Sequence, residues 1–389
     1  MSEPRTATRR PRRLARRLAL AAGCLALFDL SAKALLDLRQ PAPEGAPPAA
    51  ASSASASASA SAAGAPAEPW RIPSAEYHHD LAPCASAMAT WGDVRYPFVT
   101  NSLGLRDGTP RQVELAPRPP RRRTLIMGDS FAEGIGVPWS DTFAGRLAAL
   151  ADARGEEVLN AGVCSYAPVI HRRKLDHLLE RGLEVERVVV LIDLSDPADE
   201  LGYALEGPRV VAVPAPPPPP GPPPGPGPVG RFAVRRTLIG AALWRGWRRL
   251  TVGSSRSLGA VAERTRPRSG WTEDPELAAW VAPGLASCER HMTALAEQCR
   301  ARGLELTIVV YPAPVQLQAG VLDSLQVRRW RAWSQAQQAA FVDLFPCFLE
   351  AGPAAATYRD LFIPGDVHWN AEGHRLVAEA LARVLFPPG

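Results

Sequence analysis

A serine stands where an apolar run of the sequence ends. In 122-RRTLIMGDSFAEGIGV-137 the strand-like residues lead through Gly128 and Asp129 to Ser130. A serine in this position can be a turn residue, a helix cap or a nucleophile. As a nucleophile its hydroxyl is weak, and it needs a base within hydrogen-bond reach and a third group that orients the base. The rest of the sequence decides whether such partners exist.

His368 is the strongest candidate for the base among the seven histidines. It lies in 364-PGDVHWNAEGH-374, a predicted loop that opens the last helix, and Asp366 precedes it by two residues. In an extended loop both side chains point the same way, so Asp366 can hold one imidazole nitrogen while the other faces Ser130. An Asp-x-His pair alone is more often a cap or a turn, but together with a strand-end serine it favours a catalytic triad. Hydrolysis should then rise with pH through the imidazole range, about 6 to 7.

Acyl transfer to a serine also needs hydrogen-bond donors for the oxyanion. The second strand-like run ends in 159-LNAGVCSYAP-168, where Gly162 would let a backbone N–H approach the substrate, although a glycine there also suits a simple turn. The third run ends in 191-LIDLSDPADE-200, which contains four acidic residues and Ser195. The ordinary interpretation of this stretch is a solvated loop, and an acidic divalent-metal site is the alternative.

Apolar runs and helix-like stretches alternate over the region that holds these residues. We expect strands at 124–127, 158–161, 188–192, 304–311 and 340–344, and helices at 142–154, 168–181, 283–302, 327–338 and 371–385. Asn370 is a suitable N-cap for the last helix. This pattern is typical of a parallel sheet covered on both faces. The predicted fold class is therefore α/β, a three-layer α/β/α sandwich, in which ligands bind at the carboxyl ends of the strands.

The segments before this domain predict export. Residues 1–17 form a basic, cytoplasmic tail, and residues 18–38 have the length of a membrane span, although Asp29 and Lys33 interrupt it. An uncleaved anchor is the first interpretation and a cleaved signal segment the second; a lipoprotein-type Cys24 and a soluble amphipathic helix are the others. Either of the first two exports the remaining chain. We expect a single-pass protein of the inner membrane with a periplasmic catalytic domain.

Two low-complexity tracts bound or interrupt the domain. Residues 39–72 are rich in Pro, Ala and Ser and predict a flexible, disordered linker. The expected domain covers 73–389, and its Pro-rich insertion at 211–230 should be a surface excursion.

Charge and cysteine usage exclude some classes of partner. The densest basic run lies at the N-terminus, and no basic stripe interleaved with aromatics occurs elsewhere, so no nucleic acid is expected. The six cysteines have no zinc-like spacing, so neither a metal nor another cofactor is expected. Cys288 and Cys299 would be about 16 Å apart along one helix, too far to bond to each other, and we expect buried, unpaired cysteines.

Several motifs, each at the expected element, resemble the SGNH (GDSL-like) hydrolase superfamily. They are GDSF at 128–131, NAGV at 160–163 and D-x-H-W-N at 366–370, and 100-TNSLGLRDG-108 is similar to the lead-in of membrane-anchored bacterial members. The resemblance covers about residues 95–389 and implies the SGNH, or flavodoxin-like, arrangement of the sheet.

The resemblance also implies roles for individual residues. Ser130 would be the nucleophile and first oxyanion donor, Gly162 the second donor, and His368 the base that Asp366 orients. Where the family usually has an asparagine as third donor, this chain has Ser195, whose hydroxyl has a shorter reach. The D-x-H-W spacing is similar to that of SGNH-like O-acetyltransferases that modify exported polysaccharides.

The expected function is a serine esterase that forms an acyl-enzyme on Ser130. Its substrate would be a small ester or an O-acyl group of a cell-envelope or exported glycan, and the membrane is a further partner through residues 18–38. A polysaccharide O-acetyltransferase is one alternative, and a catalytically silent SGNH-like scaffold that binds glycan is another. Tyr166, Trp139 and Trp369 could supply a platform for a sugar ring, although core packing is the default for each.

Overall fold

The computed structural model describes residues 68–219 and 256–387, which all belong to one compact unit. The predicted basic tail at 1–17, the membrane segment at 18–38 and the second half of the Pro-rich insertion lie outside the described residues. Across the two described ranges, no helix combines the length and apolar character that a membrane crossing requires.

A sheet of five parallel strands forms the centre of this unit. Its strands, in the order β11-β10-β7-β5-β6, are β11 (Ala340–Asp343), β10 (Glu305–Val310), β7 (Arg187–Ile192), β5 (Arg123–Met127) and β6 (Glu157–Asn160). Each lies within one residue of its predicted bounds. Counted along the chain, the strand order is 2-1-3-4-5, which is the flavodoxin-like order. The order reverses between β5 and β7, and ligands bind such sheets at the carboxyl ends of the strands at this point.

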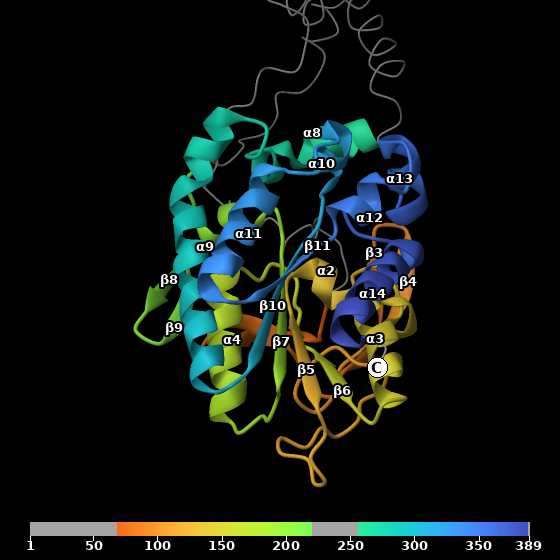
Figure 1. Cartoon of the computed structure of the whole chain (residues 1–389), viewed down its shortest axis with the longest axis vertical. Helices are drawn as coiled ribbons and strands as arrows, with labels where there is room; N and C mark the ends of the chain where they lie inside the picture. The colour runs from red at the N-terminus through yellow and green to blue at the C-terminus, as the bar shows by residue number, and fades with distance from the viewer. Residues whose placement is uncertain (1–67, 220–255, 388–389) are drawn as a thin grey trace, which may run out of the picture. The chain divides into compact units, whose positions relative to one another are not determined.

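Helices cover both faces of the sheet, which confirms the three-layer sandwich. One face carries α4 (Pro168–Glu180), α9 (Pro275–Ala301) and α11 (Leu325–Gln337), and the other carries α3 (Phe143–Asp152) and α14 (Ala371–Leu385) (Figure 1). Alternate residues of β7 supply the two cores: Val188 and Val190 face the first set of helices, and Val189 and Leu191 face the second. Because both faces of the strand are buried, its sequence is a continuous apolar run.

The helix α9 begins eight residues before its predicted start. Pro275 occupies the first helical position, and Asp274 caps it by accepting hydrogen bonds from two backbone N–H groups of the first turn. The prediction placed the start at Pro283, which in fact lies inside the helix. Cys288 and Cys299 are buried on α9 as free thiols, and none of the cysteines in the described ranges forms a disulfide.

Three antiparallel hairpins accompany the sandwich and were not predicted. They are β1 (Arg71–Ser74) with β2 (His78–Leu81), β3 (Ser86–Trp91) with β4 (Val94–Val99), and β8 (Tyr203–Glu206) with β9 (Arg209–Ala212). The predicted linker at 39–72 therefore ends too late, because Arg71 already belongs to β1. The predicted insertion at 211–230 likewise starts inside β9, whose Val210 is buried.

Shorter helices complete the unit. They are α2 (Ser130–Glu133), α5 (Asp196–Glu200), α8 (Leu258–Ser269), α10 (Pro314–Ala319), α12 (Phe345–Leu349) and α13 (Ala354–Leu361).

The acidic stretch at 191–200 is not a solvated loop. It ends β7 and forms α5, and Asp193, Asp196 and Glu200 are all buried. The burial follows from the central place of β7 and from close packing of α5 on α9, where a Cβ at Gly284 would lie 1.9 Å from the carbonyl oxygen of Pro197. The described ranges contain no group of three or more metal-ligating side chains that could hold an ion.

Candidate active site

Ser130 follows a sharp turn at the carboxyl end of β5. Gly128 has φ +156°, and a Cβ there would lie 2.7 Å from the Cβ of Ala132. Asp129 then caps α2, because its carboxylate accepts a hydrogen bond from the backbone N–H of Phe131 at 3.0 Å. Ser130 is therefore the first residue of a helix that starts directly at a strand end.

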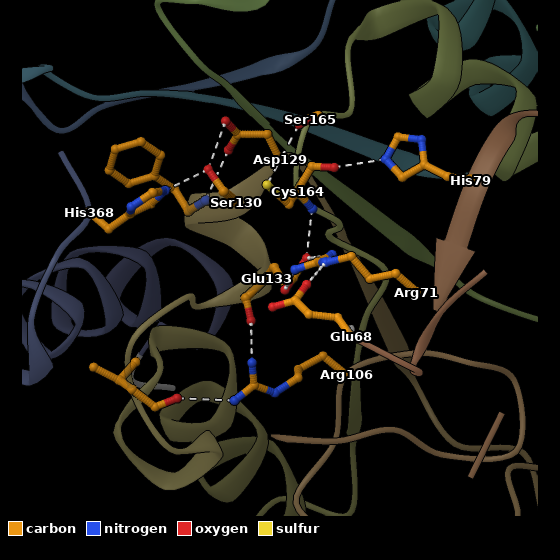
Figure 2. Close-up of polar contacts among 12 residues, drawn as sticks. Glu68, Arg71, His79, Arg106, Asp129, Ser130, Glu133, Cys164, Ser165 and His368 are labelled. Atoms are coloured by element: carbon orange, nitrogen blue, oxygen red, sulfur yellow. Dashed lines mark hydrogen bonds and ion pairs between the residues drawn. The ribbon is translucent and has the colours of Figure 1, made fainter. Parts of the chain in front are cut away.

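The structure brings together the three residues that the sequence proposed as a triad. The Oγ of Ser130 lies 2.8 Å from Nε2 of His368, and Figure 2 shows this imidazole pointing at the serine. The Nδ1 of His368 lies 2.5 Å from Oδ1 of Asp366, which also accepts a hydrogen bond from the His368 backbone N–H at 3.0 Å. One ring nitrogen of His368 thus faces the carboxylate and the other faces the hydroxyl.

The electrostatics of this pair suit a base. Burial acts to lower the pKa of His368, but the charge and hydrogen bond of Asp366 outweigh it and raise this pKa above the ordinary value. Burial acts to raise the pKa of Asp366, but the imidazolium charge and the hydrogen bonds from His368 and Trp91 hold it well below its usual range. A proton taken up by His368 is therefore stabilised, while Asp366 stays ionised.

A tryptophan that the sequence analysis did not assign to the site also contacts the carboxylate. The indole Nε1 of Trp91, on β3, donates to Oδ2 of Asp366 at 2.9 Å. Its ring lies edge-on to the imidazole of His368, with 5.3 Å between ring centroids. Trp91 and Asp366 are 275 positions apart in the chain, so no local pattern could have indicated this contact.

The backbone N–H of Gly162, the predicted second oxyanion donor, has an acceptor within the protein. Its backbone N–H donates to Oδ1 of Asn160 at 3.0 Å. A Cβ at this position would lie 2.5 Å from the Cβ of Ala132, so the glycine allows the turn after β6 to pack against α2. The side-chain amide of Asn160 completes this packing by donating to the carbonyl of Ala132 at 2.7 Å.

Ser195 also has another partner. Its hydroxyl donates to Oδ2 of Asp199 at 3.2 Å, and its backbone N–H donates to Oδ1 of Asp193 at 2.6 Å. The hydroxyl proton that a third oxyanion donor would supply is therefore directed at an acid of α5.

The loop after β6 is held by side chains from three other elements. The backbone N–H of Cys164 donates to Oε2 of Glu133 at 2.6 Å, and its carbonyl lies 2.8 Å from Nε2 of His79. The carbonyl of Ser165 accepts from the hydroxyl of Tyr203 at 3.1 Å, and Ser165 has φ +66°, a left-handed conformation. No pattern in the sequence indicated these contacts, which fix the loop beside α2.

Glu133 connects the serine helix to the first strand. Its side chain is fully buried, and the guanidinium of Arg71 donates to both carboxylate oxygens at 2.8 and 3.0 Å. The guanidinium of Arg106, 4.3 Å from the ring centroid of Phe98, donates to the Glu133 carbonyl at 3.2 Å (Figure 2). Both the side chain and the backbone at the end of α2 are therefore held by arginines.

A group of buried acids lies on the other side of the serine. Oδ2 of Asp129 is 3.4 Å from Oγ of Ser130, and its Oδ1 is 3.4 Å from the hydroxyl of Tyr311. Burial, together with the charge of Asp193, raises the pKa of Asp129 to about 8. The same causes raise the pKa of Asp196, whose Oδ1 has no hydrogen-bond partner among the described residues. The uncharged form of the acid beside the nucleophile is therefore favoured.

Two of the three aromatics considered as a sugar platform cannot serve as one. Trp369 and Tyr166 are fully buried. Trp369 packs against Phe131 and Tyr311 with 4.8 Å between ring centroids in each pair. The core-packing interpretation holds for both residues, and Trp139 is half-buried.

Comparisons with known proteins give one family match and several distant structural matches. Residues 272–387 match the family model described as "SGNH hydrolase-like domain, acetyltransferase AlgX". A G-D-S-L family lipolytic protein from Desulfitobacterium hafniense has 12% identity and a TM-score of 0.37, over 68% of this chain and 100% of that chain. An acetylxylan esterase from Geobacillus stearothermophilus has 13% identity and a TM-score of 0.34, over 67% and 93%. A search of curated proteins gives no match. The family match confirms the resemblance to SGNH hydrolases.

Proposed function

We propose that this chain is a serine acyl-enzyme of the SGNH-like type, which takes an acyl group from an ester onto Ser130. The observation that carries the proposal is the continuous chain of contacts from Ser130 through His368 to Asp366, at 2.8 and 2.5 Å. A hydroxyl, an imidazole and a carboxylate in this order form a nucleophile, its base and the group that orients the base.

The first half-reaction follows from this geometry. His368 takes the proton of the Ser130 hydroxyl as Oγ attacks the ester carbonyl, and it then gives that proton to the leaving alcohol. The backbone N–H of Ser130 is at the first position of α2 and has no acceptor within the helix, so it can donate to the oxyanion. The backbone N–H of Gly162 can become a second donor to the oxyanion only if its hydrogen bond to Oδ1 of Asn160 is broken.

The second half-reaction decides between hydrolysis and transfer. Water attacking the acyl-enzyme gives an esterase, and a sugar hydroxyl gives an O-acyltransferase. We favour O-acyl groups of exported or cell-envelope glycans as substrates, with the domain tethered outside the inner membrane by residues 18–38. The family match to an acetyltransferase domain and the D-x-H-W spacing support transfer as the second candidate. The scaffold alternative requires that Ser130 is never acylated.

The first test is acylation of the full-length protein, purified in mild detergent, by p-nitrophenyl acetate. We expect a burst of nitrophenol equal to the enzyme concentration, and an acetyl group that peptide mass spectrometry locates on Ser130. A steady rate that rises with an added polysaccharide acceptor would identify a transferase, and an unchanged rate would identify an esterase. No release of nitrophenol, or an acetyl group on another residue, would contradict the proposal and leave the scaffold.

Because Asp129 lies beside Ser130, we expect the activity to fall at alkaline pH. On the acid side the rate should rise as His368 loses its proton. Because the pKa of His368 is raised, this rise should occur at higher pH than for an unperturbed histidine. Above about pH 8, the value to which burial and Asp193 raise the pKa of Asp129, ionised Asp129 would place a negative charge 3.4 Å from Oγ. That charge opposes the negative charge that develops in the transition state.

The variant Asp129→Asn separates this effect from general alkaline damage. Its amide oxygen can still cap Phe131, while its side chain stays neutral at every pH. We expect the burst rate of the wild type to fall by about tenfold per pH unit above the transition, and the rate of Asp129→Asn to stay level. Asp141→Asn, at a partly exposed position, is the matched control and should behave as the wild type. An alkaline fall that persists in Asp129→Asn would contradict the assignment.

A further inference from the structure

The hairpin of β3 and β4 reaches the catalytic loop from the N-terminal part of the domain. Its base is fixed, because Phe98 and Tyr96 of β4 are buried and the Arg106 guanidinium lies 4.3 Å from the Phe98 ring centroid. Trp91 ends β3 and pairs with Val94 across the two-residue turn. The hairpin therefore holds the Trp91 side chain at a defined place beside the loop that carries Asp366 and His368.

The two oxygens of Asp366 have different partners. Oδ1 faces both N–H groups of His368, one from the ring and one from the backbone. Oδ2 accepts from Trp91 at 2.9 Å, and this is the one protein donor that it has within 68–219 and 256–387. The side chain of Asp366 is 28% exposed, so water would take this place if the indole N–H were removed.

We propose that Trp91 is a positioning residue for Asp366 and His368, which holds the carboxylate in the orientation that keeps the imidazole aimed at Ser130. The inference rests on the proposed function and extends the active centre to a hairpin that carries none of the triad.

The physical reason is that the carboxylate group of an aspartate rotates easily about its last side-chain torsion. The last side-chain torsion of an aspartate has a broad, roughly two-fold profile, so a hydrogen bond on one oxygen alone does not fix the plane of the group. A charge-assisted bond to the second oxygen does fix it, and such bonds are about twice as strong as neutral ones. With the plane fixed, Oδ1 stays opposite Nδ1 of His368.

A second set of contacts holds the loop against the hairpin tip. A guanidinium N–H of Arg264, on α8, donates to the carbonyl of Gly365 at 2.6 Å, and Arg256 pairs with Asp93 in the hairpin turn. Gly365 has φ +84°, and a Cβ there would lie 2.9 Å from Cγ of Arg256. Arg256 and Asp93 are mostly exposed, so their pair adds little stability, but the close approach at Gly365 fixes where the loop runs.

The test compares Trp91→Phe with Trp333→Phe in the full-length protein. Trp333 donates its indole N–H to the hydroxyl of Thr293 between α11 and α9, so its replacement removes the same atoms and a neutral indole hydrogen bond away from the site. For acylation by p-nitrophenyl acetate we expect Trp91→Phe to lower kcat about tenfold, since a hydrogen bond to a charged group is lost, with KM unchanged. Trp333→Phe should leave both constants as in the wild type.

Two further readouts distinguish positioning from packing. Without the indole N–H, Asp366 becomes a stronger acceptor for His368, so the acid limb of the rate profile should move to higher pH in Trp91→Phe only. The proton NMR signal of the His368 Nδ1–H should shift in the same variant only. A protein carrying the benzothiophene analogue of tryptophan at position 91, in which sulfur replaces the N–H, should match Trp91→Phe while keeping the ring volume.

Each outcome decides the proposal. An unchanged acid limb and NMR signal in Trp91→Phe would overturn it, and so would a raised KM with unchanged kcat, which would make Trp91 a substrate contact. Full activity of the benzothiophene protein would also overturn it, because only packing would then matter. If wild-type protein shows no acylation but the NMR signal shifts in Trp91→Phe, the proposed function fails while the positioning role stands.

Discussion

Ser130→Ala should remove the nitrophenol burst and the acetyl adduct altogether, and Asp366→Asn should lower the burst rate by roughly 10⁴-fold. The alanine has no nucleophile. The asparagine keeps the shape of the side chain but loses the charge that stabilises protonated His368, and with it the rise in the pKa of this histidine that Asp366 causes. We therefore expect the residual activity of Asp366→Asn to show its acid limb at lower pH than the wild type.

The structure also explains why an amide is a poor substitute at position 366. Three donors converge on this side chain: the ring and backbone N–H groups of His368 and the indole N–H of Trp91. An amide has one acceptor oxygen, so neither of its orientations satisfies all three. With its NH₂ toward the imidazole, the ring proton is forced onto Nε2, which then cannot accept from Ser130.

The measurement is single-turnover release of nitrophenol at excess enzyme. Asp360→Asn is the matched control, because Asp360 is exposed and its side chain pairs with its neighbour Arg359, and its rate should equal that of the wild type. A loss of less than tenfold in Asp366→Asn would show that the carboxylate does not orient the base, whereas retained acylation in Ser130→Ala would exclude Ser130 as the nucleophile.

The sheet could be predicted because its signals are local. Each strand of the central sheet is a short apolar run bounded by helix-like stretches, and the structure keeps every predicted strand within one residue. The hairpins could not be predicted in this way, because their strands are short and partly exposed. Arg71 shows the consequence: its neighbours in sequence resemble a linker, but in the fold it pairs with Leu81 in the first hairpin, and its side chain contacts buried Glu133, 62 positions away.

The candidate site was predictable to the extent that residue type and strand ends determine it. Ser130, Asp366 and His368 each follow or precede an element whose position the sequence indicates, and the fold brings them together. The direction of a hydrogen bond is not encoded in this way. Gly162 and Ser195 have the residue types that were expected, but their N–H and O–H groups are directed at Asn160 and Asp199, because tertiary packing sets those directions.

The acidic stretch after β7 shows a similar limit. Four acids within ten residues are usually solvated, since burying an ionised carboxylate is costly. Here burial and the charge of Asp193 raise the pKa of Asp196, which favours its uncharged form. Arg268 pairs with Asp199 at the edge of the group. The sequence shows the acidic residues, but their burial and their effect on one another's pKa follow from the fold.

The second large effect concerns the buried ion pair between Arg71 and Glu133, the last residue of α2. Arg71→Met should lower the free energy of unfolding by about 3 kcal/mol, because it leaves the fully buried carboxylate of Glu133 without the guanidinium that neutralises it. The backbone N–H of Cys164 still donates to the Glu133 carboxylate, and Arg106 still donates to the Glu133 carbonyl. These two donors offset only part of the lost interaction with Arg71. Urea unfolding of the wild type and the variant measures the difference.

Two comparisons make this result specific. Arg118→Met removes a guanidinium from an exposed pair with Glu184 and should change the unfolding free energy by less than about 1 kcal/mol. The double variant Arg71→Met with Glu133→Gln removes both charges and keeps an acceptor for the Cys164 N–H, so it should recover most of the loss. Arg71→Met should also slow acylation of Ser130, because Glu133 holds the loop after β6 beside α2. Equal stability of Arg71→Met and Arg118→Met would show that the buried pair does not stabilise this part of the fold.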